Sequence, residues 1–101
     1  MKLNKEIITN SILENKDVFI KNNITSISIF GSIASDNWKD GDRIELAFEA
    51  DATKGKDLMI MLYQRELILE VLNVPGLEAH HIQLLKKEVL KRLADEGVKI
   101  Y

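Results

Sequence analysis

Two short segments of the chain alternate apolar and polar residues, and a turn-forming stretch joins them. The first covers residues 25–30 and the second residues 43–49, where the apolar positions are Ile44, Leu46 and Phe48. Successive side chains of a strand point to opposite faces, so each segment is predicted to be a β-strand with one face in a core. Residues 31–42 are rich in glycine, aspartate and asparagine, which predicts a helical turn followed by a polar loop.

Helical spacing of apolar residues marks three further segments. Residues 4–22 are predicted to form an amphipathic helix with a break near Asn15. A second helix runs from 58 to about 72, with Asp57 as its candidate N-cap. A third, 83–96, is amphipathic and ends before a glycine.

The remaining residues complete a single domain, 1–101. Residues 77–82 are a short candidate strand, and residues 98–101 are predicted to be a terminal tail. Helices and strands therefore alternate along the chain, without repeats or linkers. We predict an α/β fold, a small mixed β-sheet of three or four strands flanked by α-helices.

Composition excludes several classes of function. A net charge of −2 and a pI near 5.7 give no basic surface for duplex DNA. Cysteine is absent from the sequence, so disulfides and thiolate sites are excluded. No apolar run approaches the roughly 18 residues of a membrane span, and the first ten residues are polar and periodic. We expect a cytoplasmic protein without a membrane segment.

Residues 27–32, which end in Gly31-Ser32, and the segment Arg43–Phe48 together resemble a known signature. It is that of the minimal nucleotidyltransferases, small relatives of DNA polymerase β. In that family a glycine-serine turn is followed, at this spacing, by Asp-hydrophobic-Asp on a strand. Here Arg43 stands at the first aspartate position and Glu45 at the second. Glu78 matches the third carboxylate position. The resemblance covers essentially the whole chain and implies a polymerase-β-like nucleotidyltransferase fold.

The resemblance implies roles for these residues. Gly31 and Ser32 would bind the phosphates of ATP, because a glycine before a turn lets the backbone approach phosphate closely. Glu45 and Glu78 would be the catalytic carboxylates and would hold Mg²⁺, which bridges phosphate oxygens and activates the attacking hydroxyl. The implied cofactors are thus Mg²⁺ and ATP.

Arg43 argues against that chemistry. At about 5 Å and an effective dielectric constant near 20, each unit of charge acts on a divalent ion with roughly 6–7 kcal/mol. Replacing a carboxylate by a guanidinium changes the local charge by two units, so we predict weak or absent metal binding and lost catalysis. Arg43 could occupy the position of the metal and bond to Glu45 and Glu78. Alternatively, it begins an exposed strand edge and pairs with nothing.

The resemblance also implies a partner. Minimal nucleotidyltransferases commonly act with a helical protein of the HEPN type as antitoxins, some by transferring AMP to a tyrosine of that partner. We predict a catalytically degenerate, partner-binding protein of the antitoxin type. One alternative is an active Mg²⁺-dependent enzyme that transfers AMP from ATP to a protein. Another is a structural homo-oligomer built by the apolar helix 58–72, which has more apolar residues than one buried face needs.

Other residues are interpreted structurally. His80 and His81 point apart on a strand and are expected to be one exposed and one packed side chain rather than a metal site. Trp38 is expected to pack on the domain, with base stacking as the alternative. The basic residues of the last helix are interpreted as a solvated face: Lys86, Lys87, Lys91 and Arg92.

Overall fold

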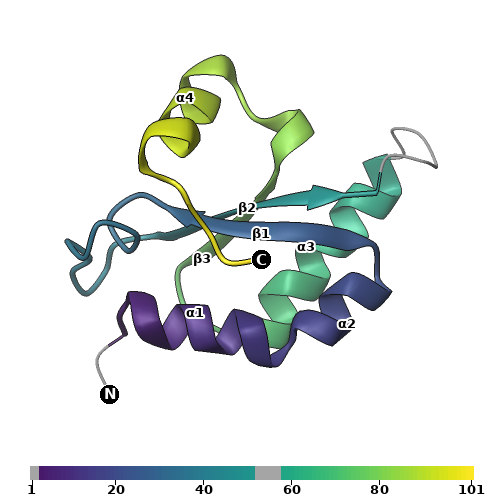
Figure 1. Cartoon of the computed structure of the whole chain (residues 1–101), viewed down its shortest axis with the longest axis horizontal. Coiled ribbons are helices and arrows are strands. Elements are labelled where there is room, and N and C mark those ends of the chain that lie inside the picture. Colours follow the sequence, from purple (N-terminus) through teal and green to yellow (C-terminus); the bar gives the residue numbers. More distant parts are fainter. Residues whose placement is uncertain (1–2, 52–57) are drawn as a thin grey trace.

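The computed structural model describes residues 3–51 and 58–101, and its centre is a four-stranded sheet (Figure 1). The strand order is β3-β2-β1-β4. β1 pairs antiparallel with β2 and β4, whereas β2 and β3 are parallel. This mixed sheet confirms the predicted fold class. The strands are β1 (Ile24–Phe30), β2 (Ile44–Ala50), β3 (Leu77–His81) and β4 (Val98–Lys99).

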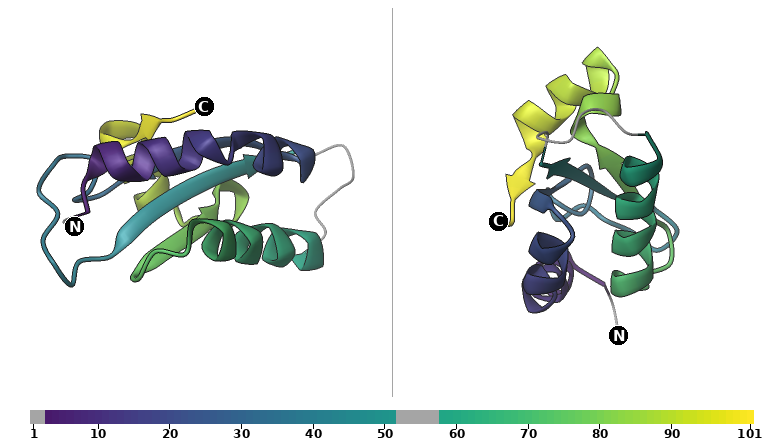
Figure 2. Two further views of the ribbon diagram at one scale, coloured as in Figure 1. Left: turned by 90° about the horizontal axis from the view of Figure 1, so that it is seen from below. Right: turned by 90° about the vertical axis from the view of Figure 1, so that its right-hand side faces the viewer.

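Helices cover both faces of the sheet, as Figures 1 and 2 show. One face carries α1 (Lys5–Glu14), α2 (Lys16–Lys21) and α3 (Leu58–Leu72). The other carries the 3₁₀ helix η2 (Ile82–Leu84) and α4 (Lys87–Glu96). No helix within the described ranges is long and apolar enough to cross a membrane.

The predicted break of the first helix at Asn15 is confirmed. Asn15 separates α1 from α2, and its side-chain Nδ2 donates to the Ser11 carbonyl oxygen at 2.8 Å. Asparagine competes with the backbone for hydrogen bonds, which explains why the helix changes direction there. The predicted cap Asp57 lies outside the described residues.

The core lies between the sheet and the three helices α1, α2 and α3. Ile68 and Leu72 of α3 pack there, and Gln64 joins α3 to the end of α2 by donating from Nε2 to the Asn22 carbonyl oxygen at 3.2 Å. Burial of these branched side chains is the main stabilising term of the fold. The strands contribute Ile24, Ile27, Ile29, Ile44, Leu46, Phe48 and Ala79 to this cluster.

Two sequence predictions near the end of the chain are wrong. The predicted tail 98–101 contains β4, which pairs with the free edge of β1, and the Ile100 amide donates to the Ile27 carbonyl oxygen at 2.8 Å. A strand of two residues is too short to show a periodicity, so the pattern could not reveal it. The predicted helix 83–96 begins only at Lys87, because residues 82–84 form η2 instead.

His81 is the packed member of the histidine pair, as expected. Its ring lies edge-on to Phe48, with the centroids 5.1 Å apart, and its Nδ1 accepts from the Gln83 amide at 3.1 Å. His80, at 36% exposure of its side chain, lies 3.9 Å from a Glu78 oxygen. Burial lowers the pKa of the His81 imidazole below its ordinary 6.5, an effect that the Glu49 carboxylate partly offsets.

This lowered pKa predicts a loss of stability in mild acid. Between pH 6.5 and the lower pKa of folded His81, the unfolded chain binds more protons than the folded chain, so the free energy of unfolding falls as pH falls. Protonation of Nδ1 also removes the acceptor for the Gln83 amide. Urea unfolding between pH 7.5 and 5.5 should show this slope. The slope should flatten in His81→Gln and persist in His80→Gln; equal slopes in all three proteins would contradict the prediction.

Candidate functional site

Three side chains form a row across the sheet on the face that carries α4. In the strand register, Phe30 of β1 is opposite Glu45 of β2, and Glu45 is beside Glu78 of β3. Paired residues on neighbouring strands point to the same face, so the two carboxylates are direct neighbours. Two of the predicted site residues are therefore brought together by backbone pairing.

Gly31 follows Phe30 and turns the chain at the end of β1. Its φ of +80° lies in the left-handed region, which favours glycine. A Cβ at this position would collide with Oε2 of Glu45. The backbone conformation therefore favours glycine here, and the missing Cβ also leaves room for the close approach of the Glu45 carboxylate.

After Gly31 the chain makes successive turns rather than an α-helix. The Gly31 carbonyl oxygen accepts from the Ala34 amide at 3.2 Å and from the Ser35 amide at 3.3 Å. The Ser32 carbonyl oxygen accepts from the Asn37 amide at 2.9 Å, and the Ser32 side chain is half-buried. The predicted helical turn is therefore a series of turns, which begins at Gly31 directly after Phe30.

Arg43 lies one residue before β2 and forms an ion pair with Glu78. The distance from Arg43 Nε to Glu78 Oε2 is 3.2 Å, and 78% of the arginine side chain remains exposed. The expectation of an unpaired arginine is therefore wrong. The expected bond to Glu78 is present, whereas Glu45 has a different arginine as its partner.

That partner is Arg92 of α4, which sequence reasoning assigned to a solvated face. Its Nη2 is 3.1 Å from Glu45 Oε2, and its Cζ is 5.6 Å from the centre of the buried Phe30 ring. Arg92 also follows Val89 by three positions, so it borders the apolar side of its helix. That position was the available signal, because long basic side chains often cover apolar surface with their stems.

Residues at this site do not fit the Mg²⁺ ion that the sequence resemblance implies. Each of the two carboxylates is already paired with a guanidinium, one from Arg43 and one from Arg92. Within residues 3–51 and 58–101, moreover, no three His, Cys, Asp or Glu side chains are grouped so that they could hold a metal ion. A site for Mg²⁺ needs carboxylate oxygens that are free to face the ion.

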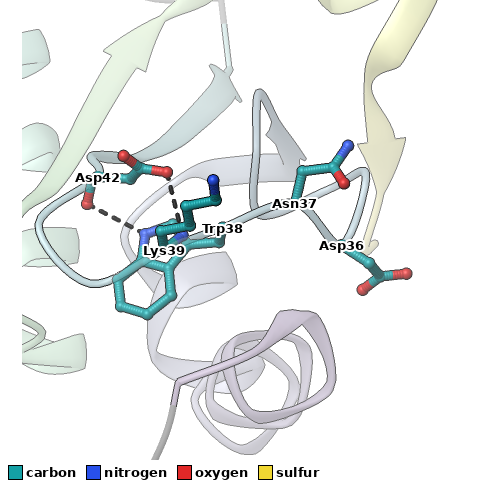
Figure 3. Close-up of a pocket in the computed structure, with 5 residues that line it drawn as sticks. All are labelled: Asp36, Asn37, Trp38, Lys39 and Asp42. Carbon is teal, nitrogen blue, oxygen red and sulfur yellow. Dashed lines mark hydrogen bonds between the residues drawn. The ribbon is translucent and has the colours of Figure 1, made fainter.

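Trp38 packs on the domain, as the structural interpretation predicted. Its ring lies against the core cluster, and its Nε1 donates to the Asp42 carbonyl oxygen at 3.0 Å. The Lys39 amide donates to Asp42 Oδ2 at 3.0 Å, which closes the loop (Figure 3). These three residues border an open depression of about 600 Å³. Asp36 and Asn37, which precede Trp38 in the loop, complete its lining.

No protein-family model and no curated protein sequence matches the chain. Solved structures do match its fold. A chain of a toxin–antitoxin complex crystallised with AMP-PNP aligns with 92% of this chain and 72% of its own length, at 15% identity and a TM-score of 0.63. A chain from the complex of a tri-AMPylated Shewanella oneidensis HEPN toxin with an MNT antitoxin aligns with 96% and 71%, at 14% identity and a TM-score of 0.62.

A candidate nucleotidyltransferase from Sulfolobus solfataricus aligns with 94% of this chain and 77% of its own length, at 17% identity and a TM-score of 0.54. Identities this low establish the architecture and not the chemistry. The chain has the fold of the minimal nucleotidyltransferases, as its sequence signature predicted.

The collision at Gly31 predicts an unequal cost for two glycine substitutions. Gly31 and Gly41 both have positive φ, +80° and +94°, but a Cβ at Gly41 meets nothing within 4 Å. Gly41→Ala should lower the free energy of unfolding by about 1–2 kcal/mol, the cost of a left-handed alanine. Gly31→Ala should cost up to about 1 kcal/mol more, because the end of the Glu45 side chain must move and its ion pair with Arg92 is disturbed. Chemical denaturation measures both, and equal losses would contradict the close contact.

Proposed function

We propose that this chain is a catalytically degenerate nucleotidyltransferase-like protein that acts by binding a protein partner, as the antitoxin-type component of a pair with a HEPN-type helical protein. The observation that carries the proposal is the pairing of both site carboxylates with arginines, Glu45 with Arg92 and Glu78 with Arg43. Two of the structures with the same fold come from toxin–antitoxin complexes, which supports the kind of partner.

Loss of catalysis follows from charge. Nucleotidyl transfer needs divalent ions to neutralise a polyphosphate and activate a hydroxyl. The Glu45 and Glu78 carboxylates would first have to release their arginines, and a divalent ion would then bind beside two positive charges. We infer that Mg²⁺-ATP binds only weakly at Gly31 and Ser32.

A surface for the partner is available on α3. Its first two turns expose five large apolar side chains, whereas the buried side chains of the helix face the sheet. Exposed apolar side chains gathered on one helix are typical of protein interaction sites. They are Leu58, Met59, Ile60, Leu62 and Tyr63.

An active enzyme is the second candidate. It is favoured by the retained turn at Gly31 and Ser32 and by the half-buried Glu45 beside it. One structure of the same fold was solved with AMP-PNP, and another contains an AMPylated toxin. In this alternative the exposed guanidinium of Arg43 would contact a phosphate instead of excluding a metal.

Labelled ATP separates the two candidates. We expect no transfer of label when the protein is incubated with labelled ATP, Mg²⁺ and its genomic neighbour, because the carboxylates are paired with arginines. A gel with autoradiography measures the transfer. Label transfer by the natural protein that disappears in Glu45→Ala would establish the active enzyme and overturn the proposed loss of catalysis.

A pair of leucine substitutions tests the interaction surface. Leu62 on α3 and Leu13 on α1 are equally exposed, at 44% each. Leu62→Glu should weaken association with the HEPN-type partner, or with a second copy of the chain, at least tenfold, which is about 1.4 kcal/mol. Leu13→Glu should leave it unchanged. Both should alter stability by no more than about 0.5 kcal/mol.

Light scattering of the isolated chain, followed by calorimetric titration with the partner, distinguishes the two kinds of association. A stable monomer that binds the partner through α3 supports the proposal. A homo-oligomer broken by Leu62→Glu, with no affinity for the partner, would favour the structural alternative. Equal effects of the two substitutions would remove α3 as the interaction surface.

A further inference from the structure

The two site carboxylates are neutralised by the protein itself. Glu45 and Glu78 are paired across neighbouring parallel strands, where two negative charges would repel one another. Arg92 Nη2 lies 3.1 Å from Glu45, and Arg43 Nε lies 3.2 Å from Glu78. Two guanidinium groups carry the same charge as one divalent ion. The electrostatic requirement that a metal would meet is therefore met already.

The two arginines come from different parts of the fold. Arg43 immediately precedes β2, which carries Glu45. Arg92 extends from α4, which follows β3 in the chain. Only the pair of Arg92 and Glu45 crosses between α4 and the sheet, among the ion pairs that the described residues form. Replacement of the Arg92 guanidinium would thus change how the whole of α4 is attached to the sheet.

Attachment of α4 depends on few other contacts. None of its residues is buried: Val89 and Leu93 are half-buried and Leu90 is exposed. Arg92, in contrast, bonds to the half-buried Glu45 and places its guanidinium over the ring of Phe30, which is fully buried. The Arg92 side chain is 46% exposed, so this cation–π contact is only partly shielded from water.

We propose that Arg92 and Arg43 take the place of the metal ions, and that the pair of Glu45 and Arg92 now forms an ionic joint that holds α4 on the sheet. Docking of α4 through Arg92 competes with binding of a divalent cation at Glu45, because Oε2 of that carboxylate is already bonded to the Arg92 guanidinium. This inference rests on the proposed loss of the metal site and gives its residues a new role: Arg92 is a positioning residue for α4.

Hydrogen exchange of the α4 amides tests the joint. Arg92→Gln and Glu45→Gln should each accelerate exchange in residues 87–96 by about three- to fivefold, the scale of one partly exposed ion pair. The double variant should exchange no faster than either single variant, since both remove the same contact. Lys91→Gln, an equal charge change at the neighbouring exposed position, should have no effect. Unchanged exchange in Arg92→Gln, or additive effects in the double variant, would overturn the joint.

Metal binding tests the competition with an independent readout. Mn²⁺, followed by its electron paramagnetic resonance signal, should bind at least tenfold more tightly to Arg43→Gln/Arg92→Gln than to the natural protein. Addition of Glu45→Gln should abolish this gain. Equal Mn²⁺ affinity with and without the arginines would overturn the competition. It would also be overturned if Mn²⁺ bound at Glu45 in the natural protein and hydrogen exchange of the α4 amides stayed unchanged. Arg43→Gln alone, at an exposed position before β2, keeps the test valid if loss of Arg92 unfolds the chain.

The joint and the proposed function can fail separately. Association with a partner is measured through Leu62 on α3, which lies on the opposite face of the sheet from α4. Failure of the Leu62→Glu prediction with accelerated exchange in Arg92→Gln would remove the α3 surface and leave the joint. Label transfer from ATP by the natural protein, with Mn²⁺ bound at Glu45, would remove the proposed loss of catalysis and the joint together.

Discussion

The register of β2 against its two neighbours determines everything else at the site. It aligns Phe30, Glu45 and Glu78 on one face and buries Ile44, Leu46 and Phe48 on the other. A shift of one residue would reverse both faces, placing Glu45 in the core and leucine under α4. The large apolar side chains beneath the sheet therefore fix the position of charged groups above it. Stability and site geometry depend on the same pairing.

How far the sequence could predict this arrangement differs from residue to residue. Alternation of apolar residues revealed β1 and β2 and the face that carries Glu45, because side-chain direction follows directly from strand geometry. The place of Glu78 was implied by the family resemblance alone. For Arg43 the sequence left open contact with both glutamates or with neither, and the structure shows contact with Glu78. Arg92 was missed, because it is 47 residues from Glu45 and only the packing of α4 brings them together. Periodicity describes one element at a time and cannot state which faces of two distant elements meet.

Charge balance explains how the two site carboxylates can lie side by side in the folded chain. Adjacent carboxylates on a sheet destabilise the folded state unless cations accompany them. In this chain the cations are supplied by arginines, so the charge balance does not depend on the concentration of free metal ion. The glycine that admits the Glu45 carboxylate beside β1 is used in the same arrangement. The residues of the signature thus have structural roles that do not require turnover of nucleotide.

The position of α4 between two anchored segments has a further consequence for its motion. On one side η2 follows β3, where His81 caps it, and on the other β4 is bonded to β1. If α4 left the sheet, it would therefore remain part of a loop held at both ends and would not become a free chain end. The entropy gained by such a short loop is small and grows only slowly with its length. Even a modest contact can consequently keep the helix docked, and its opening would leave the four-stranded sheet complete.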